Sequence, residues 1–112
     1  MLAIYNGPEC LADRVKVAVQ ERQRRTGLLG RTSFEPGEAL WIIPCDQIHT
    51  MGLLWSIDVI FLSKDSVVRM VATVPPGTAS VSCPGAHSCI ELPPGVAAAI
   101  AVGTQLTIQP LA

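Results

Sequence analysis

Two apolar runs joined by a short polar link constrain the fold of this chain more than any other feature. Residues 57–62 and 67–74 are rich in Val and Ile, whose branched side chains favour extended backbone. Only the four polar residues 63–66 lie between them, and a connection of this length suits a β-hairpin. The two runs therefore predict adjacent antiparallel strands.

Shorter segments predict further strands on both sides of this hairpin. Residues 15–19 alternate apolar and polar side chains, as half-buried strands do, and residues 2–5 are expected to pair with them across Asn6-Gly7-Pro8. Because proline cannot donate a hydrogen bond to a central ladder, any strand in the Pro-rich stretch 75–95 is expected to be short or marginal. The remaining predicted strands are residues 40–43, 88–92 and 104–109.

Helical signals are few. Residues 20–28 are rich in Gln, Glu and Arg, which are good helix formers, and a short helix is expected to end near Gly27 or Gly30. Residues 96–101 predict a helical turn of small side chains. Because no long helices alternate with the strands, the expected fold is mostly β or α+β. We expect a small antiparallel or mixed β-barrel-like sheet with one or two short helices.

Size and composition predict one soluble domain over residues 1–112. With 49% apolar and 15% charged residues, the chain can bury a single core. Its longest apolar run, 96–102, has seven residues, whereas a helix that crosses a bilayer needs about 18. The first six residues lack the basic start and apolar stretch of a secretory leader, so the cytoplasm is the expected location.

The charge distribution argues against polyanionic partners. The formal net charge is −1, which gives no overall attraction to nucleic acid. A group of arginines has no interleaved aromatic residues, so it is expected to be mainly a solvated helix face; its members are Arg22, Arg24, Arg25 and Arg31. No nucleic acid or membrane partner is expected, which leaves a protein partner or a small ligand.

Cysteines and histidines occur in two similarly spaced pairs, Cys45 with His49 and Cys83 with His87. Thiolate and imidazole are preferred zinc ligands, so the four side chains could close a tetrahedral site. The spacing is not that of a two-residue cysteine knuckle, and ordinary buried or loop thiols are the simpler interpretation. We expect no cofactor, with zinc as the alternative. Four unevenly spaced cysteines are also too few for a disulfide framework, so reduced thiols are expected.

The same residues permit a nucleophilic interpretation. A cysteine needs a neighbouring base or cation to become a thiolate. Cys45 or Cys83 could pair with His49 or His87, with Asp58 orienting the imidazole. A thiol-dependent enzyme is therefore an alternative, although the sequence does not show that these side chains meet.

Asp58 is the most informative single residue, because it interrupts the apolar run 57–62. A buried carboxylate is costly unless donors or a cation satisfy it. We expect Asp58 to anchor the preceding loop by hydrogen bonds, with a ligand-binding or catalytic role as the alternative. The candidate partners are His49, Thr50, Arg24 and Arg31. Trp41 and Trp55 flank the polar 45–51 loop and could line a pocket, although tryptophans are more often core residues.

Several blocks together resemble one known family. They are residues 24–31, 45–52, 57–62 and 89–95, with Gly103 beyond them. Their combined spacing is similar to the domain of unknown function 192 family, a widespread bacterial group, over about residues 10–109. The family's arginine, Gly-Leu and second arginine fall on Arg24, Gly27, Leu28 and Arg31; its frequent Asn-Thr and its aspartate fall on His49, Thr50 and Asp58. The resemblance implies a compact β-rich fold, exported in some members, and no known reaction.

We therefore expect a non-enzymatic binding or accessory module with a polar site around the 45–51 loop and Asp58. Its candidate residues are Cys45, His49, Thr50, Asp58, Arg24 and Arg31. The alternative is a zinc-dependent or thiol-dependent enzyme that uses Cys45, His49 and His87.

Overall fold

The structure is a computed structural model that describes residues 1–111, and the side chain of Arg25 lies outside this description. The described part contains one helix, α1 (Glu21–Thr26), and short strands. The strands are β1 (Leu2–Asn6), β2 (Glu9–Ala18), β3 (Gly37–Ile42), β4 (Gln47–Ile48), β5 (Ile57–Leu62), β6 (Val68–Val74), β7 (Val81–Ser82), β8 (Ser88–Leu92) and β9 (Thr107–Pro110). The fold is mostly β, as the sequence predicts.

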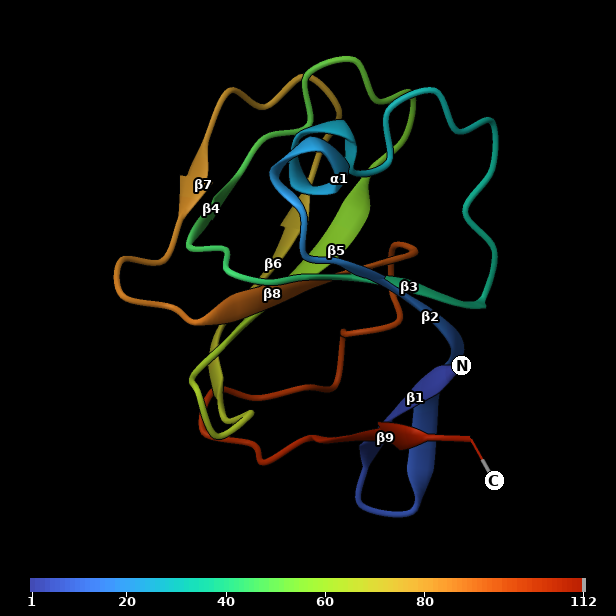
Figure 1. Ribbon diagram of the computed structural model, residues 1–112, viewed down its shortest axis with the longest axis vertical. Helices are drawn as coiled ribbons and strands as arrows, with labels where there is room; N and C mark the ends of the chain where they lie inside the picture. Colours follow the sequence, from blue (N-terminus) through green and yellow to red (C-terminus); the bar gives the residue numbers. More distant parts are fainter. Residues whose placement is uncertain (112) are drawn as a thin grey trace.

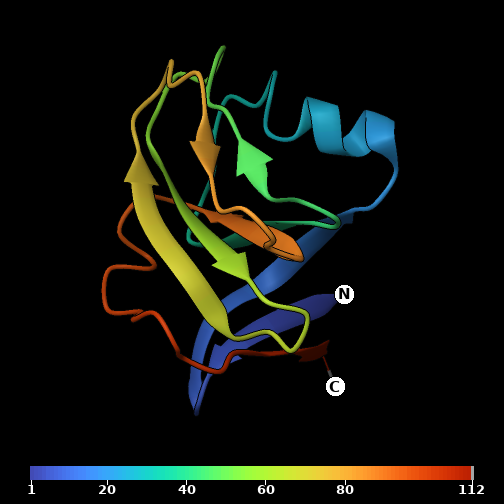
Figure 2. The same ribbon diagram turned by 90° about the vertical axis from the view of Figure 1, so that its left-hand side faces the viewer.

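Seven strands form one curled sheet in the order β6-β5-β8-β3-β2-β1-β9 (Figure 1). Only β2 and β3 run parallel; the other neighbouring pairs are antiparallel. The segment before β9 returns to the far edge of the sheet, where Val67 pairs with Gln105 and the Val68 N–H donates to Thr104 O at 2.8 Å. The two sheet edges therefore meet at one end, and the result is the half-closed barrel of Figure 2.

The two faces of this sheet carry separate apolar cores. Residues 60 and 62 of β5 belong to a core inside the curl, whereas residues 57, 59 and 61 belong to a second core on the opposite face. This division follows from the alternation of side chains along a strand. The second core also contains Leu28, which follows α1, and Ile48 of β4. The segments around α1 and β4 therefore cover the outer face of the sheet.

The predicted hairpins are confirmed. Strands β5 and β6 pair in antiparallel register, from Ile57 opposite Val74 to Leu62 opposite Val68. Strands β1 and β2 also pair antiparallel, and β2 is longer than the predicted segment 15–19. The alternation of side chains and the turn residues were sufficient to predict both hairpins, because the two strands of each hairpin lie close together in the chain.

The predicted short helix is confirmed over Glu21–Thr26, and it ends as expected at Gly27, which takes a positive φ of 50°. Residues 96–101 form the predicted turn of small side chains, closed by i to i−3 hydrogen bonds such as Ile100 N–H to Ala97 O at 3.0 Å. Strand β8 has the predicted bounds and is short, but it is not marginal, because it lies between β3 and β5 and all five of its residues are buried. The nearby prolines lie outside its ladder.

The pair β4 and β7 was not predicted, because each strand has only two residues and shows no readable period. In the described part of the chain, no helix has the length and apolar character needed to cross a membrane.

Candidate functional site

Asp58 is buried, as predicted, but it anchors a different loop from the one expected. Its side chain faces the inner core, and Oδ1 accepts a hydrogen bond from Thr73 Oγ1 at 2.8 Å. Oδ2 accepts from the backbone N–H groups of Gly95 and Ala97, each at 2.9 Å. The carboxylate therefore fixes the crossover that follows β8. The predicted donors His49, Thr50, Arg24 and Arg31 are not its partners, because the 45–51 loop covers the opposite face of the sheet.

Thr50 is fully buried and joins two loops instead. Its Oγ1 donates to Pro75 O at 2.6 Å and accepts from the Thr78 N–H at 2.9 Å. Its backbone N–H also donates to Thr78 O at 2.9 Å, and its carbonyl accepts from Gly77 at 2.9 Å. Thr50 therefore holds the end of the predicted polar loop in place.

Replacing Thr50 by Val should lower the free energy of unfolding by about 1–3 kcal/mol, because a valine of the same shape leaves the Thr78 N–H without its acceptor. Urea unfolding followed by circular dichroism measures this loss. Thr50→Ser is the matched control and should retain most of the stability, since it keeps the hydroxyl. Equal losses in the two variants would contradict this assignment.

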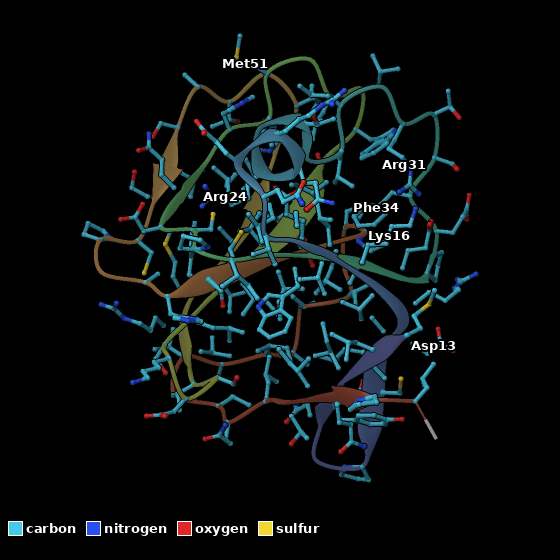
Figure 3. All side chains as sticks on the ribbon, in the orientation of Figure 1. Asp13, Lys16, Arg24, Arg31, Phe34 and Met51 are labelled. Atoms are coloured by element: carbon cyan, nitrogen blue, oxygen red, sulfur yellow. The ribbon has the colours of Figure 1, made fainter. Side chains whose placement is uncertain are left out.

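Arg31 belongs to a surface cluster and not to the predicted site. Its Nη2 lies 2.7 Å from Glu38 Oε1, and its guanidinium carbon lies 5.8 Å from the ring centroid of Phe34. Phe34 in turn stacks on Trp55, with ring centroids 5.9 Å apart. Figure 3 shows Arg31 and Phe34 at one side of the molecule, apart from Arg24. A hydrogen bond from the Glu35 N–H and then the pairing with Arg31 lower the pKa of Glu38.

The four predicted zinc ligands do not converge. His49 and His87 are exposed, Cys83 is buried in the second core, and His49 Nδ1 accepts from the Met51 N–H at 3.2 Å. Among the described residues, no three His, Cys, Asp or Glu side chains are grouped so that they could hold a metal ion. The sulfur beside Cys45 is that of Cys89, at 3.3 Å.

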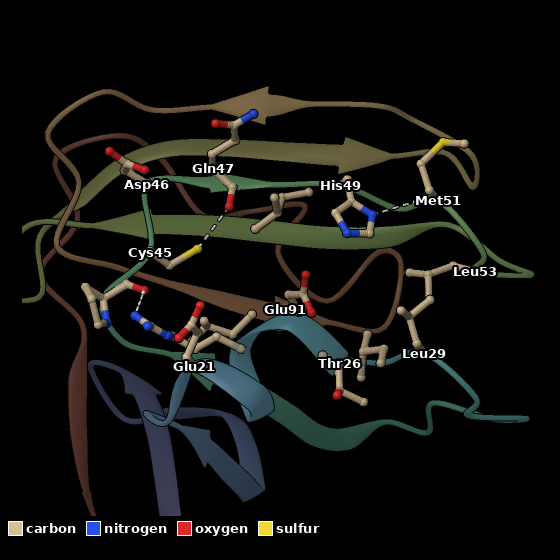
Figure 4. A pocket seen from close by; sticks show the side chains of 16 residues that line it. Glu21, Thr26, Leu29, Cys45, Asp46, Gln47, His49, Met51, Leu53 and Glu91 are labelled. Carbon is tan, nitrogen blue, oxygen red and sulfur yellow. Dashed lines mark hydrogen bonds between the residues drawn. The ribbon is translucent and has the colours of Figure 1, made fainter.

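The 45–51 loop does line a pocket, with a volume of about 520 Å³ (Figure 4). Helix α1 and the turn after it form the opposite wall. Of the predicted site residues, Cys45, His49 and Arg24 line this pocket, and Arg24 Nη1 lies 3.5 Å from Pro44 O. Neither tryptophan is among the lining residues. Trp41 instead packs against the inner core and donates from Nε1 to Ser88 Oγ at 3.0 Å.

Glu91 of β8 lies at the floor of the pocket and was not predicted as a site residue. Figure 4 shows its carboxyl group between α1 and the 45–51 loop. It is only 4% exposed, and within the described residues its carboxyl group has no hydrogen bond or ion pair. Burial, and then the charge of nearby Cys45, raise the pKa of Glu91 to about 7. This carboxyl group can therefore change its charge near neutral pH and can pair with a ligand of positive charge.

A signal for Glu91 was present in the sequence. It stands between Ile90 and Leu92, just as Asp58 stands between Ile57 and Val59. An acid in an apolar run is costly to bury, so the sequence signal is the same for Asp58 and Glu91. Only the structure shows that the protein supplies donors to Asp58, whereas Glu91 opens to a pocket.

Cys45 and Cys89 stand at one wall of the same pocket. Cys45 is half-buried and Cys89 is fully buried. The Cys89 thiol donates a hydrogen bond to Cys45 Sγ, which lowers the pKa of Cys45. The same hydrogen bond, together with burial, raises the pKa of Cys89 well above its usual value. The two thiols are therefore chemically unequal.

Comparison with known proteins gives fold and family. No curated protein matches the chain. The crystal structure of a protein of unknown function from Novosphingobium aromaticivorans DSM 12444 is similar with a TM-score of 0.81 and 20% identity, covering 95% of this chain and 82% of that one. A crystal structure described as a "putative transcription regulator" from Sinorhizobium meliloti 1021 has a TM-score of 0.79 and 19% identity, covering 95% and 90%.

At these identities the likeness to the two structures concerns the fold alone. The sequence model of one family, DUF192 or "Uncharacterized ACR", matches residues 4–108, which is nearly the whole chain. This match agrees with the resemblance of the blocks around Arg24, Thr50, Asp58 and Glu91. The chain belongs to the DUF192 family, whose function is unknown.

Proposed function

We propose that this protein is a non-enzymatic binding module whose pocket takes a small primary amine with a short apolar body. The observation that carries the proposal is the buried Glu91 carboxyl group, which faces the pocket without a partner among the described residues. A buried carboxylate is costly unless it is paired, and an ammonium group supplies both the charge and the hydrogen bonds.

The charges around the pocket support a cationic ligand. The carboxyl groups of Asp46 and Glu91 line it, against the guanidinium of Arg24 among the described side chains. The remaining lining is largely apolar and suits an alkyl or aryl body; it includes Leu28, Leu29, Ile42, Ile48, Met51 and Leu53. A ligand would place its ammonium group at Glu91 and its apolar part along this lining.

A small ligand also fits the overall charge better than nucleic acid does, because the formal net charge is −1. We further propose a cytoplasmic location. All four cysteines are free thiols in the described structure, and thiols persist in reducing compartments.

Titration with n-hexylammonium tests the proposal. At pH 8 it should bind the wild-type protein, whereas hexanoate and 1-hexanol at equal concentration should bind more weakly. Amide chemical shifts of the residues around Glu91 report the binding. Glu91→Gln should weaken it by about 2 kcal/mol, or roughly 30-fold, because removing one partner of a buried charge pair is expensive.

The pH dependence provides an independent check. Because the pKa of Glu91 is about 7, the ionised form that binds the ammonium group falls to roughly a tenth of the protein at pH 6. The apparent affinity should therefore fall about tenfold between pH 8 and pH 6. Asp65→Asn, in the exposed connection between β5 and β6 and outside the pocket lining, is the matched control and should change the affinity little. Tighter binding of hexanoate, or unchanged binding by Glu91→Gln, would refute the proposal.

A further inference from the structure

The thiols of Cys45 and Cys89 form a pair that amine binding does not require. Their sulfur atoms lie 3.3 Å apart although the residues are 44 positions apart in the chain. A disulfide has an S–S distance of about 2.05 Å, so the sulfurs need to approach by only about 1.2 Å more. A change of this size is within the range of side-chain rotation.

The backbone holds the two residues in this arrangement. Cys89 lies on β8, where it is opposite Ile42 of β3. Cys45 is the third residue after the end of β3, and its N–H donates to His87 O at 3.2 Å. Both cysteines are therefore fixed to the same two paired strands, and bond formation between them does not require the sheet to open.

Access to the two sulfurs is unequal. Cys45 lines the pocket, as Figure 4 shows. It is half-buried, whereas Cys89 has no exposed surface. A reagent in solution therefore reaches Cys45 first. The hydrogen bond from Cys89 favours the thiolate of Cys45, which is the reactive form of a cysteine.

The other two cysteines lack this arrangement. Cys10 is exposed on β2, and Cys83 is buried in the second core. Among the described residues, neither has a sulfur contact like that between Cys45 and Cys89.

We infer that Cys45 and Cys89 are a redox-active dithiol that exchanges with small-molecule disulfides entering the pocket. The Cys45 thiolate attacks one sulfur of the small disulfide, the S–S bond of that molecule breaks, and one thiolate leaves. Cys89 then loses its proton and attacks the Cys45 sulfur, which releases the second thiolate and forms the Cys45–Cys89 disulfide. The two protons of the protein thiols pass to the two leaving thiolates, so that two protein thiols are oxidised while one disulfide is reduced.

Oxidised glutathione at pH 8, added to the fully reduced protein, tests this inference. The wild-type protein should lose the thiols of Cys45 and Cys89, and peptide mapping should recover one crosslinked pair containing both residues. Dithiothreitol should restore both thiols. Cys89→Ala should lose only the Cys45 thiol and should accumulate a stable glutathione adduct there, because the resolving sulfur is missing. Cys45→Ala should leave Cys89 unmodified.

Cys10→Ser is the matched control, since it removes an exposed thiol remote from the pair and should leave the crosslink unchanged. If Cys89→Ala does not fold by circular dichroism, Cys89→Ser serves in its place. The inference is wrong if Cys45 and Cys89 stay reduced under these conditions, or if the crosslink joins Cys45 to Cys83. Neither outcome bears on amine binding at Glu91, so the two proposals can fail separately.

Discussion

Asp58→Ala should lower the free energy of unfolding by about 4 kcal/mol. The change removes the acceptor of three hydrogen bonds, from Thr73 Oγ1 and from the backbone of Gly95 and Ala97. Each buried donor that loses its partner costs about 1–3 kcal/mol, and small domains have only about 5–15 kcal/mol of stability in total. Urea unfolding at pH 7 measures the loss.

Asp58→Asn distinguishes the contribution of the hydrogen bonds to stability from that of the carboxylate charge. The amide oxygen can accept from Gly95 and Ala97, while the amide nitrogen donates to the Thr73 hydroxyl. This variant should lose clearly less stability than Asp58→Ala. If both variants were as stable as the wild-type protein, Asp58 would not anchor the crossover between β8 and β9, and its burial would need another explanation.

Glu91→Gln, unlike Asp58→Ala, should raise the free energy of unfolding at alkaline pH. The pKa of Glu91 is raised from 4.5 to about 7, first by burial. Between these two values the folded state holds a proton that the unfolded state has released, so stability falls as the pH rises through this window. With about 1.4 kcal/mol for each pKa unit, the loss above pH 7 is about 3 kcal/mol. A neutral glutamine has no charge to bury, so the variant does not lose this stability as the pH rises.

Unfolding free energies of the two proteins between pH 4 and pH 8.5 check this prediction. The difference between Glu91→Gln and wild type should be small near pH 4 and should grow until about pH 7. Glu38→Gln is the contrasting control. Because the pKa of Glu38 is lowered, its contribution is present above its ordinary pKa and is lost as the pH falls, so its removal should destabilise the protein at neutral pH. A wild-type profile that is flat between pH 5 and pH 7 would contradict the assignment to Glu91.

The two buried acids differ in the hydrogen-bond donors that the protein gives them. Asp58 receives a full set of donors from the protein, whereas the carboxyl group of Glu91 has none from the described residues. A residue that lowers stability at working pH is typical of functional sites. This contrast is the reason for assigning ligand binding to Glu91 rather than to Asp58.

Local sequence patterns were sufficient for much of the fold. The apolar runs and the four polar residues between them predict the β5–β6 hairpin, and the turn at Gly7 predicts the β1–β2 pair. The burial of Asp58 could also be predicted, because both of its chain neighbours, Ile57 and Val59, are apolar. Each of these conclusions depends on residues that lie within a few positions of one another.

Tertiary structure alone decided which residues meet at the pocket. Alternation along a strand fixes that Glu91 and Ile90 point to opposite faces, but it does not say which face of the curled sheet closes on an inner core and which carries the pocket. That depends on the pairing of β8 with β3 and β5, whose residues are far apart in the chain. The same long-range pairing places Cys89, and not a histidine, beside Cys45.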